Sequence, residues 1–236
     1  MNKKNIYTFV ILILLVILLI ILLVSYSTSD SSMDDGLLTD KPCKAPCFNG
    51  LTPGQATALD IDQFIKGLNA KKWAGIDTSV QKTGCKVIQI SDKPGMTVRS
   101  LVRFYINDGK LTYILSSHDN MPTLKQIAEH LGPPEYTKAL NVIGPDGSFY
   151  SLDVFYPKQG VAFKVSVSNK ELGFIKPEMK VSDIEYYEPG DLLNYYLAKH
   201  GCNVGQGGAE MNARKEIDNY IQPWAGFGSI NVIDVN

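Results

Sequence analysis

The chain has few of the residues from which metal and catalytic sites are usually built. It contains three histidines, four cysteines and two tryptophans. The cysteines lack the spacing of a zinc site, and three histidines do not supply the missing ligands. No G-x-S-x-G turn and no P-loop is present. We therefore expect no metal and no cofactor, and we find no catalytic constellation, which favours a protein that is not an enzyme.

The sequence also has no excess of charge of one sign. It carries 23 Lys and Arg against 24 Asp and Glu. Without Lys3 and Lys4, the remainder has 21 basic and 24 acidic residues, a net charge of about −3. A nearly neutral, slightly acidic surface argues against nucleic acid as a partner and against a polybasic membrane patch.

A long apolar run is present at the start of the chain. Ile6 to Val24 are apolar except for Thr8. As a helix this run is about 28 Å long, close to the ~30 Å hydrocarbon core of a bilayer. Lys3 and Lys4 precede the run, whereas the segment after it contains acidic residues before its first cation. The positive-inside rule then predicts that residues 1–5 are cytoplasmic and that the rest is extracytoplasmic.

We interpret residues 6–24 as a single-pass signal anchor in the cytoplasmic membrane, with the lipid bilayer as its partner. A cleaved signal peptide is the alternative, although the run exceeds the usual hydrophobic length of such peptides. A lipoprotein is less favoured because the first cysteine, Cys43, lies far downstream. Residues 25–42 are rich in Ser and Asp, and they predict a flexible tether.

The four cysteines predict disulfides, because an even number in an exported chain favours pairing. Cys43 and Cys47 can close a small ring at the start of the domain. Cys85 and Cys202 would then form a second, long-range pair. Free thiols and a metal site are the alternatives, and the sequence alone leaves the connectivity open.

Local patterns predict two similar units, 43–119 and 120–236. A helix at 58–69 is capped by Thr57, and a second helix follows Thr123, with a capping box and an end at Gly132. Asp-Gly at 108–109 predicts a hairpin. We expect strands at 85–90, 98–106, 111–115, 136–143, 148–156, 161–168 and 181–187. The predicted class is α+β, with helices packed on a mostly antiparallel sheet built from two helix–hairpin units.

The last part of the chain predicts further helices. Asp191 should cap a short helix that ends at Gly201, and the glycine-rich segment 205–208 is interpreted as a flexible loop. A helix is expected at 209–221, followed by a rigid turn at 223–227 and an apolar tail.

The opening of the domain resembles a known family. Its motif is Pro42-Cys43, then Pro46-Cys47-Phe48-Asn49-Gly50-Leu51-Thr52-Pro53-Gly54 with Thr57. This is similar to exported, membrane-attached bacterial proteins of unknown function. The segments Thr123–Pro134 and Pro223–Phe227 resemble the same family. It carries no known catalytic residues.

The helix-then-hairpin unit is also similar in fold to the small lipoprotein of the outer-membrane barrel-assembly machinery. This chain departs from that lipoprotein because it has no lipid-bearing cysteine and a much longer domain. Fold similarity does not imply function.

The histidines are weak candidates for chemistry. His118 lies in Ser-Ser-His-Asp, but neighbouring residues on a strand point to opposite faces, so a polar turn is favoured over a nucleophile–base pair. His130 is expected at the surface of the second helix. His200 is expected at a helix end, where a cation interacts favourably with the dipole.

Other polar and aromatic candidates also have simple structural interpretations. Asp60 and Asp62 could pair, but Asp60 is better explained as a helix cap. The tyrosines at 186–187 and 195–196 could form a ligand surface, although we expect Tyr196 and one of the first pair in the core. Trp224 and Phe227 are the better candidates for an interaction surface, although core packing is favoured even for these two.

The sequence thus predicts a membrane-tethered extracytoplasmic interaction or structural module. Its partner would be an envelope protein or a cell-wall component, bound through the face or edge of the sheet. The alternatives are a small exported hydrolase and a sensor ectodomain that binds a small ligand between the two units.

Overall fold

The structure is a computed structural model, and it describes residues 36–68, 73, 75–81, 83–92, 100–144, 147–165, 167, 173–204 and 206–235. The predicted stub, the predicted anchor at 6–24 and most of the predicted tether lie outside the described residues. Within those described, no helix has the length and apolar character needed to cross a membrane. Leu37, near the end of the predicted tether, is buried within the compact unit that begins at Asp35.

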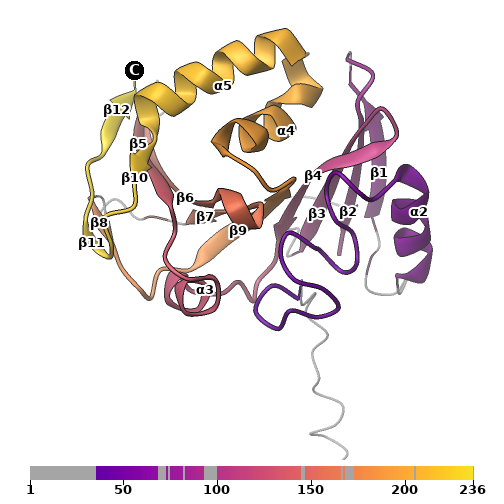
Figure 1. Ribbon diagram of the computed structural model, residues 1–236, viewed down its shortest axis with the longest axis horizontal. Helices are drawn as coiled ribbons and strands as arrows, with labels where there is room; N and C mark the ends of the chain where they lie inside the picture. Colours follow the sequence, from indigo (N-terminus) through magenta and orange to yellow (C-terminus); the bar gives the residue numbers. More distant parts are fainter. Residues whose placement is uncertain are drawn as a thin grey trace, which may run out of the picture. The chain divides into compact units, whose positions relative to one another are not determined.

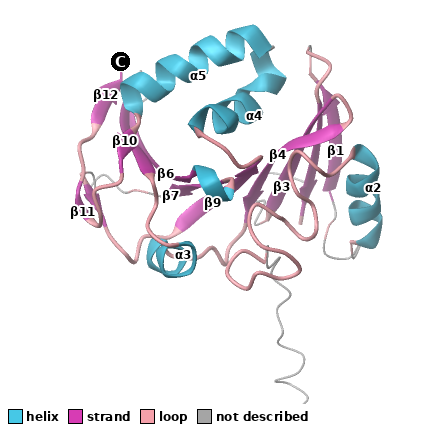
Figure 2. Ribbon diagram, viewed as in Figure 1, coloured by secondary structure: helices cyan, strands magenta, loops and turns pink. Residues whose placement is uncertain are grey.

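A large sheet forms the centre of this unit (Figures 1 and 2). Its strands run in the order β1-β2-β3-β4-β9-β7-β6-β5-β10, with β12 also on β5. All pairings are antiparallel except β12 with β5. The strands of this sheet are β1 (Gly75–Val80), β2 (Lys86–Ser91), β3 (Leu101–Asn107), β4 (Lys110–Ser117), β5 (Tyr136–Gly144), β6 (Gly147–Tyr156), β7 (Val161–Val165), β9 (Val181–Tyr187), β10 (Gln222–Pro223) and β12 (Ile233–Val235).

The predicted α+β class with a mostly antiparallel sheet is therefore confirmed. A separate two-stranded sheet joins β8 (Phe174–Ile175) to β11 (Gly228–Ser229). We did not predict β1, whose residues are nearly all exposed and whose sequence alternates weakly. It forms because it pairs with β2. The predicted strand at 161–168 is shorter than expected, since β7 ends at Val165.

The two predicted helix caps are confirmed. Thr57 precedes α2 (Ala58–Gly67) and Thr123 precedes α3 (Leu124–Leu131), each with a complete capping box. The helical spacing of the apolar residues from 59 to 68 predicts a buried face made of Leu59, Ile61, Phe64, Ile65 and Leu68. This is partly wrong, because Leu59 is 62% exposed. Gly132 ends α3 with φ 85° and ψ −177°, which is a positive φ outside the left-handed helical region.

The C-terminal helices are longer than the sequence predicts. α4 (Leu192–Val204) continues through Gly201, and α5 (Gln206–Tyr220) begins where a flexible loop was expected. Both predictions are wrong because tertiary packing outweighs the low helix propensity of glycine. Ala209 and Ala213 of α5 are fully buried. Asp191 does cap α4, since its Oδ1 accepts the N–H of Asn194 at 3.0 Å.

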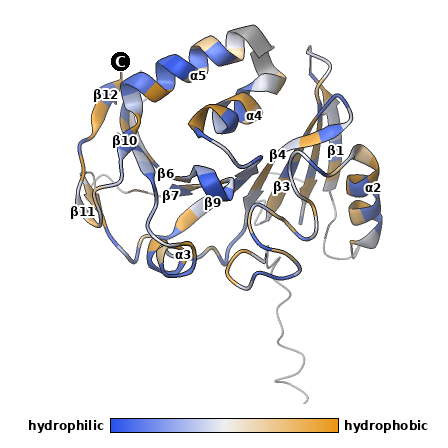
Figure 3. Cartoon of the chain, viewed as in Figure 1, coloured by the Kyte–Doolittle hydropathy of each residue, from blue (hydrophilic) through white to orange (hydrophobic). Residues whose placement is uncertain are grey.

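The two faces of the sheet bury different residues. On one face Phe48 contacts Phe64 of α2, Phe104 and Tyr186. The other face carries an aromatic cluster beneath α4 and α5 (Figure 1), made of Tyr113, Phe155, Ala162, Tyr187, Leu192, Tyr195, Tyr196 and Ala213. α5 is mostly hydrophilic along its length (Figure 3). It therefore meets the sheet through few apolar side chains, which leaves room for polar contacts.

The same backbone contacts recur at the two capped helices. Thr57 bridges Lys110 at the start of β4, and Thr123 bridges Lys180 just before β9. Two hydrogen bonds flank each bridge in the same pattern: Ala58 N to Gly109 O with Leu111 N to Ala56 O, and Leu124 N to Met179 O with Val181 N to Pro122 O. The hairpin predicted at Asp108-Gly109 is confirmed, because it joins β3 to β4 and both residues have positive φ.

Both disulfides form. Cys43 pairs with Cys47, and Cys85 pairs with Cys202 across 117 residues. All four cysteines are thereby used, which excludes free thiols and a cysteine-ligated metal. The long-range bond ties α4 to the residue that precedes β2.

Candidate functional site

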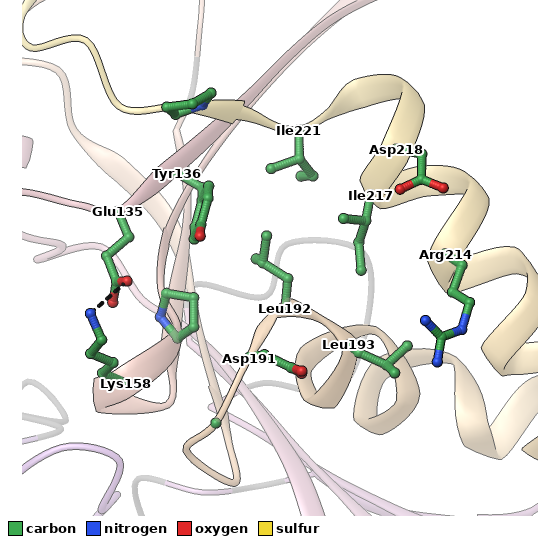
Figure 4. A pocket seen from close by; sticks show the side chains of 13 residues that line it. Glu135, Tyr136, Lys158, Asp191, Leu192, Leu193, Arg214, Ile217, Asp218 and Ile221 are labelled. Carbon is green, nitrogen blue, oxygen red and sulfur yellow. Dashed lines mark hydrogen bonds and ion pairs between the residues drawn. The ribbon is translucent and has the colours of Figure 1, made fainter.

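A pocket of about 550 Å³ opens where α4 and α5 meet the start of β5 (Figure 4). Its volume is within the range of small-ligand and side-chain pockets. The floor is apolar and the rim is charged. The apolar lining includes Tyr136, Leu192, Leu193, Ile217 and Ile221, and the charged lining comprises Glu135, Lys158, Asp191, Arg214 and Asp218.

The charges of the rim differ in how they are neutralised. Lys158 Nζ lies 3.0 Å from Glu135 Oε2, at one side of the pocket (Figure 4). Arg214 points to Glu210 on its own helix, at 2.8 Å. Asp218 is exposed, and among the described residues no hydrogen bond or ion pair to it is found. Asp191 accepts the N–H of Asn194 at the helix N-terminus, and no described cation pairs with it, so the rim has a surplus of negative charge.

The floor of the pocket rests on the aromatic cluster. Leu192 belongs to this cluster together with Tyr195 of the same helix. The ring of Tyr195 meets Phe155 at 5.2 Å and Tyr187 at 5.1 Å between centroids, both edge-on. Edge-to-face contacts of this kind stabilise a specific arrangement. They hold the first turns of α4 in place beneath the pocket.

A fully buried carboxylate fastens α4 to the sheet. Glu185 of β9 has no exposed surface, and it accepts a hydrogen bond from the hydroxyl of Tyr195. Lys199 Nζ lies 3.2 Å from its Oε1, and Lys164 Nζ lies 3.6 Å from the same atom. Burial alone would raise the pKa of Glu185, but the two ammonium groups outweigh it and hold that pKa below its ordinary value.

A second buried ion cluster fastens α5. Lys138 Nζ lies 3.0 Å from Asp153 Oδ2 and 2.9 Å from Glu216 Oε1, and the Lys138 side chain is 8% exposed. Burial acts to lower the pKa of Lys138, but the carboxylates of Asp153 and Glu216 raise it above its ordinary value. Lys138, Asp153 and Lys164 are direct cross-strand neighbours on β5, β6 and β7. A row of alternating charge therefore lies under the helices.

Neither cluster is predicted by the sequence. Lys164 alternates with the apolar residues Val161, Phe163 and Val165, a pattern that predicts an outward-facing side chain; it lies instead on the face of the sheet that α4 and α5 cover. The available signal was a charged residue on each of several neighbouring strands. That signal has meaning only once the strand order is known, because β9 lies between β4 and β7 despite its late position in the chain.

The predicted aromatic sites are distributed differently from expectation. Tyr186, Tyr187, Tyr195 and Tyr196 are all fully buried, so the expectation that only one of the first pair is in the core was wrong. Phe227 is 41% exposed, and Trp224 is half-buried against it, with ring centroids 5.5 Å apart. Core packing is thus wrong for Phe227. The backbone N–H of Trp224 donates to Glu135 O beside the pocket.

The histidines do not line this pocket. His130 lies at the surface as predicted, 3.1 Å from Asp40. His118 is half-buried just after β4. His200 lies inside α4 instead of at its end, stacked on Tyr196, with Nε2 3.9 Å from Glu216. The predicted dipole role of His200 is wrong, because α4 continues to Val204. Burial also lowers the pKa of His200 despite the nearby carboxylate.

The remaining predicted polar candidates are structural. Asp60 accepts hydrogen bonds from the N–H and hydroxyl of Thr57, which lower its pKa. Asp62 is exposed. Among the described residues, no group of three or more His, Cys, Asp or Glu is placed to hold a metal ion. Comparison of the chain with protein-family models, curated proteins and solved structures finds no match.

Proposed function

We propose that the chain is a membrane-tethered extracytoplasmic module that binds a segment of an envelope protein in the pocket of Figure 4. The observation that carries this proposal is the combination of an apolar floor and an acidic rim on a firmly attached helical layer. A preformed pocket with a few polar groups around an apolar base is typical of binding sites.

Three features support the proposed location: the apolar segment, the disulfides and the opening motif of the domain. The apolar segment at 6–24 would anchor the chain, and residues 25–35 would be part of the tether. Two disulfides are typical of proteins in an oxidising compartment. The resemblance of the opening motif to exported, membrane-attached proteins supports the same location.

The proposed architecture is a duplicated helix–strand unit with a C-terminal addition. The recurring hydrogen bonds at Thr57 and Thr123 support the duplication. So does the strand order, in which β1-β2-β3-β4 and β5-β6-β7-β9 meet through their last strands. α4 and α5 follow the second unit, and the segment 190–223 that contains them supplies most of the residues that line the pocket. The binding site would therefore belong to the addition more than to the repeat.

The chemistry of the pocket favours an apolar side chain next to a basic one. Leu192, Ile217 and Ile221 offer an apolar surface with no charge at its base. Glu135 and Arg214 already have partners of opposite sign, whereas Asp218 remains available to a cation. A leucine or phenylalanine flanked by lysine or arginine matches this arrangement. The charged neighbour would set specificity more than affinity.

A random peptide display against the whole chain tests this preference. We expect enriched peptides to share a bulky apolar residue within three positions of Lys or Arg. Ile217→Asp places a carboxylate on the floor and should weaken binding of the enriched peptides at least tenfold, because a buried charge without a partner is costly. Met211→Asp is the matched control on α5, since Met211 is 69% exposed and outside the pocket.

Two results would contradict the proposal. One is a display that enriches no common motif. The other is a set of peptides that bind Ile217→Asp and the unaltered chain equally well. Asp218→Asn tests the basic neighbour separately from the apolar side chain. In this variant the enriched peptides should lose their preference for Lys or Arg and keep the bulky apolar residue.

A sensor of small ligands is the second candidate, favoured by another cavity. A space of about 450 Å³ lies between the β3–β4 hairpin and α4, with Asn107 and Thr112 on one side and Asn194, Leu197 and Ala198 on the other. A thermal-shift screen with small metabolites tests it: Ala198→Trp should remove any stabilisation that a metabolite confers. For the hydrolase alternative, the pair most similar to a catalytic histidine and carboxylate is His200 beside Glu216. Neither residue lines this cavity or the pocket of Figure 4.

A further inference from the structure

The two edges of the large sheet differ in whether other strands cover them. β5 is covered along its outer edge by β10 and β12, two short strands from the end of the chain. At the other end, β1 pairs with β2, and no other described strand pairs with it. An edge strand of this kind presents a row of backbone N–H and C=O groups that can accept another strand.

β1 has few of the features that usually block edge pairing. Its sequence, Gly-Ile-Asp-Thr-Ser-Val, contains no lysine and no proline. It pairs with β2 in continuous register, without a bulge. Ile76 is 58% exposed and Val80 is 70% exposed, so two large apolar side chains lie on the edge. Natural proteins rarely leave such an edge without a partner.

The sequence of β1 is complementary to itself when two copies run antiparallel. With Thr78 opposite Thr78, Ile76 faces Val80 of the second copy, and Asp77 faces Ser79. Facing residues in an antiparallel pair point to the same side, so Ile76, Thr78 and Val80 stay on the side of Ile88 and Ile90. Apolar pairs and Thr–Thr pairs are among the favourable cross-strand contacts.

The neighbouring registers are less favourable. A pair centred on Asp77 places two carboxylates directly opposite each other, which is destabilising. A pair centred on Ser79 sets Thr78 against Val80 and leaves Ile76 without an apolar partner. Of these three registers, only the one centred on Thr78 pairs Ile76 with Val80 and separates the two aspartates.

We propose that two copies of this chain associate through β1 in an antiparallel pair centred on Thr78, so that their sheets become continuous. The self-complementary register favours a second copy over a strand of another protein. A six-residue strand pair buries less surface than a standard stable interface, so the association in solution is weak and depends on concentration. This inference is independent of the pocket and of the proposed partner.

Cysteine cross-linking of the full chain in detergent micelles tests the register. The native cysteines are all in disulfides, so an introduced cysteine is the single free thiol. Thr78→Cys places two thiols directly opposite, with Cβ atoms about 5 Å apart. Ile76→Cys places them four residues apart along the strand, about 14 Å. Under a mild oxidant, we expect Thr78→Cys to form a covalent dimer about tenfold faster than Ile76→Cys, a difference that follows from these distances.

Two further variants distinguish association from chance collision. Val80→Lys places a charge on the edge, and in the Thr78→Cys background it should slow cross-linking several-fold. Met211→Lys is the matched control and should leave the rate unchanged, because Met211 is equally exposed but lies on α5. Circular dichroism confirms that each variant is folded before its rate is compared.

Three outcomes would overturn the proposal. Equal rates for Thr78→Cys and Ile76→Cys would mean that no register is preferred. Faster cross-linking by Asp77→Cys or Ser79→Cys would mean a different register. A Thr78→Cys rate no higher than that of Met211→Cys would mean that β1 does not self-associate.

Discussion

Lys199 on α4 and Glu185 on β9 form an ion pair, with Nζ and Oε1 3.2 Å apart, beneath the helical layer. Glu185 has no exposed surface, whereas Lys199 retains 21% of its side-chain exposure. The pair therefore reaches from the interior of the sheet to the surface of α4. It joins the helix that lines the pocket to a central strand, and the free energy of unfolding should depend on it.

The first prediction concerns this pair. Glu185→Gln removes the counter-ion of Lys199 and Lys164 at a buried position. Breaking a buried ion pair in this way costs about 3–5 kcal/mol of the free energy of unfolding. Urea unfolding monitored by circular dichroism measures the loss. The control is Glu129→Gln, because Glu129 of α3 is exposed and pairs with Lys125 at the surface. A loss below about 1 kcal/mol, the value of a surface pair, would contradict the prediction.

The second prediction concerns pH. The pKa of His200 in the folded chain lies below its ordinary value of 6.5, because burial disfavours the imidazolium. As the pH falls, the unfolded chain therefore takes up this proton at a higher pH than the folded chain does. The free energy of unfolding then decreases as the pH drops below about 6.5. The pKa of Glu185 is lowered from 4.5, so a second loss of stability begins below about pH 4.5.

His200→Phe separates the two pH windows. Phenylalanine can keep the stacked contact with Tyr196 but cannot titrate. We expect the variant to lose the decline between neutral pH and about pH 5, and to retain the decline at lower pH. Urea midpoints measured across this range provide the comparison. An unchanged profile above pH 5 would mean that another group is responsible.

The third prediction compares the two disulfides. The Cys85–Cys202 bond closes a loop of 117 residues, whereas the Cys43–Cys47 bond has a sequence separation of 4. In the chain-entropy account, loss of the long loop costs about 4–5 kcal/mol and loss of the short one about 2 kcal/mol. Paired Cys→Ala variants of each bond, unfolded in urea, measure the difference. A larger loss for the short loop would contradict this order.

The fourth prediction uses the two equivalent helix caps. Thr57→Ala and Thr123→Ala each remove the hydroxyl of a capping box, and each should cost about 1 kcal/mol of stability. Thr→Ser at the same positions retains the hydroxyl and should cost much less. Since the two caps lie on separate helices, the losses should add in the double variant. Clear non-additivity would mean that the two helices are energetically coupled.

Local sequence patterns predicted most elements of the fold, because those elements depend on nearby residues. A capping box needs only Thr123 and Gln126, and the hairpin at Asp108-Gly109 needs only its own positive φ angles. By contrast, β1 and the full lengths of α4 and α5 depend on partners that are distant in the sequence. Helix propensity at Gly201 was a poor guide because α4 is held there by Cys202.

The candidate site could not be predicted for the same reason. Its pocket combines residues from 135 to 223, which meet only after α4 and α5 have packed on the sheet. Trp224 and Phe227, the surface candidates from sequence, lie next to this region but do not line it. Tyr196 and one of Tyr186 and Tyr187 were expected in the core. Tyr187, Tyr195 and Tyr196 are buried beneath the helical layer, whereas Tyr186 is buried on the other face against Phe48, so the burial of all four depends on tertiary packing.

The sequence by itself determined the composition of the domain, its helix caps, its turns and the oxidisable cysteines, because these follow from local geometry and residue chemistry. The tertiary structure alone decided the strand order, the two buried ion clusters and the pocket. Placement of β9 between β4 and β7 brings Glu185 close to Lys164 and Lys199. Such charges are stable in the interior only when a fold brings their partners within a few ångströms, and no local pattern encodes that distance.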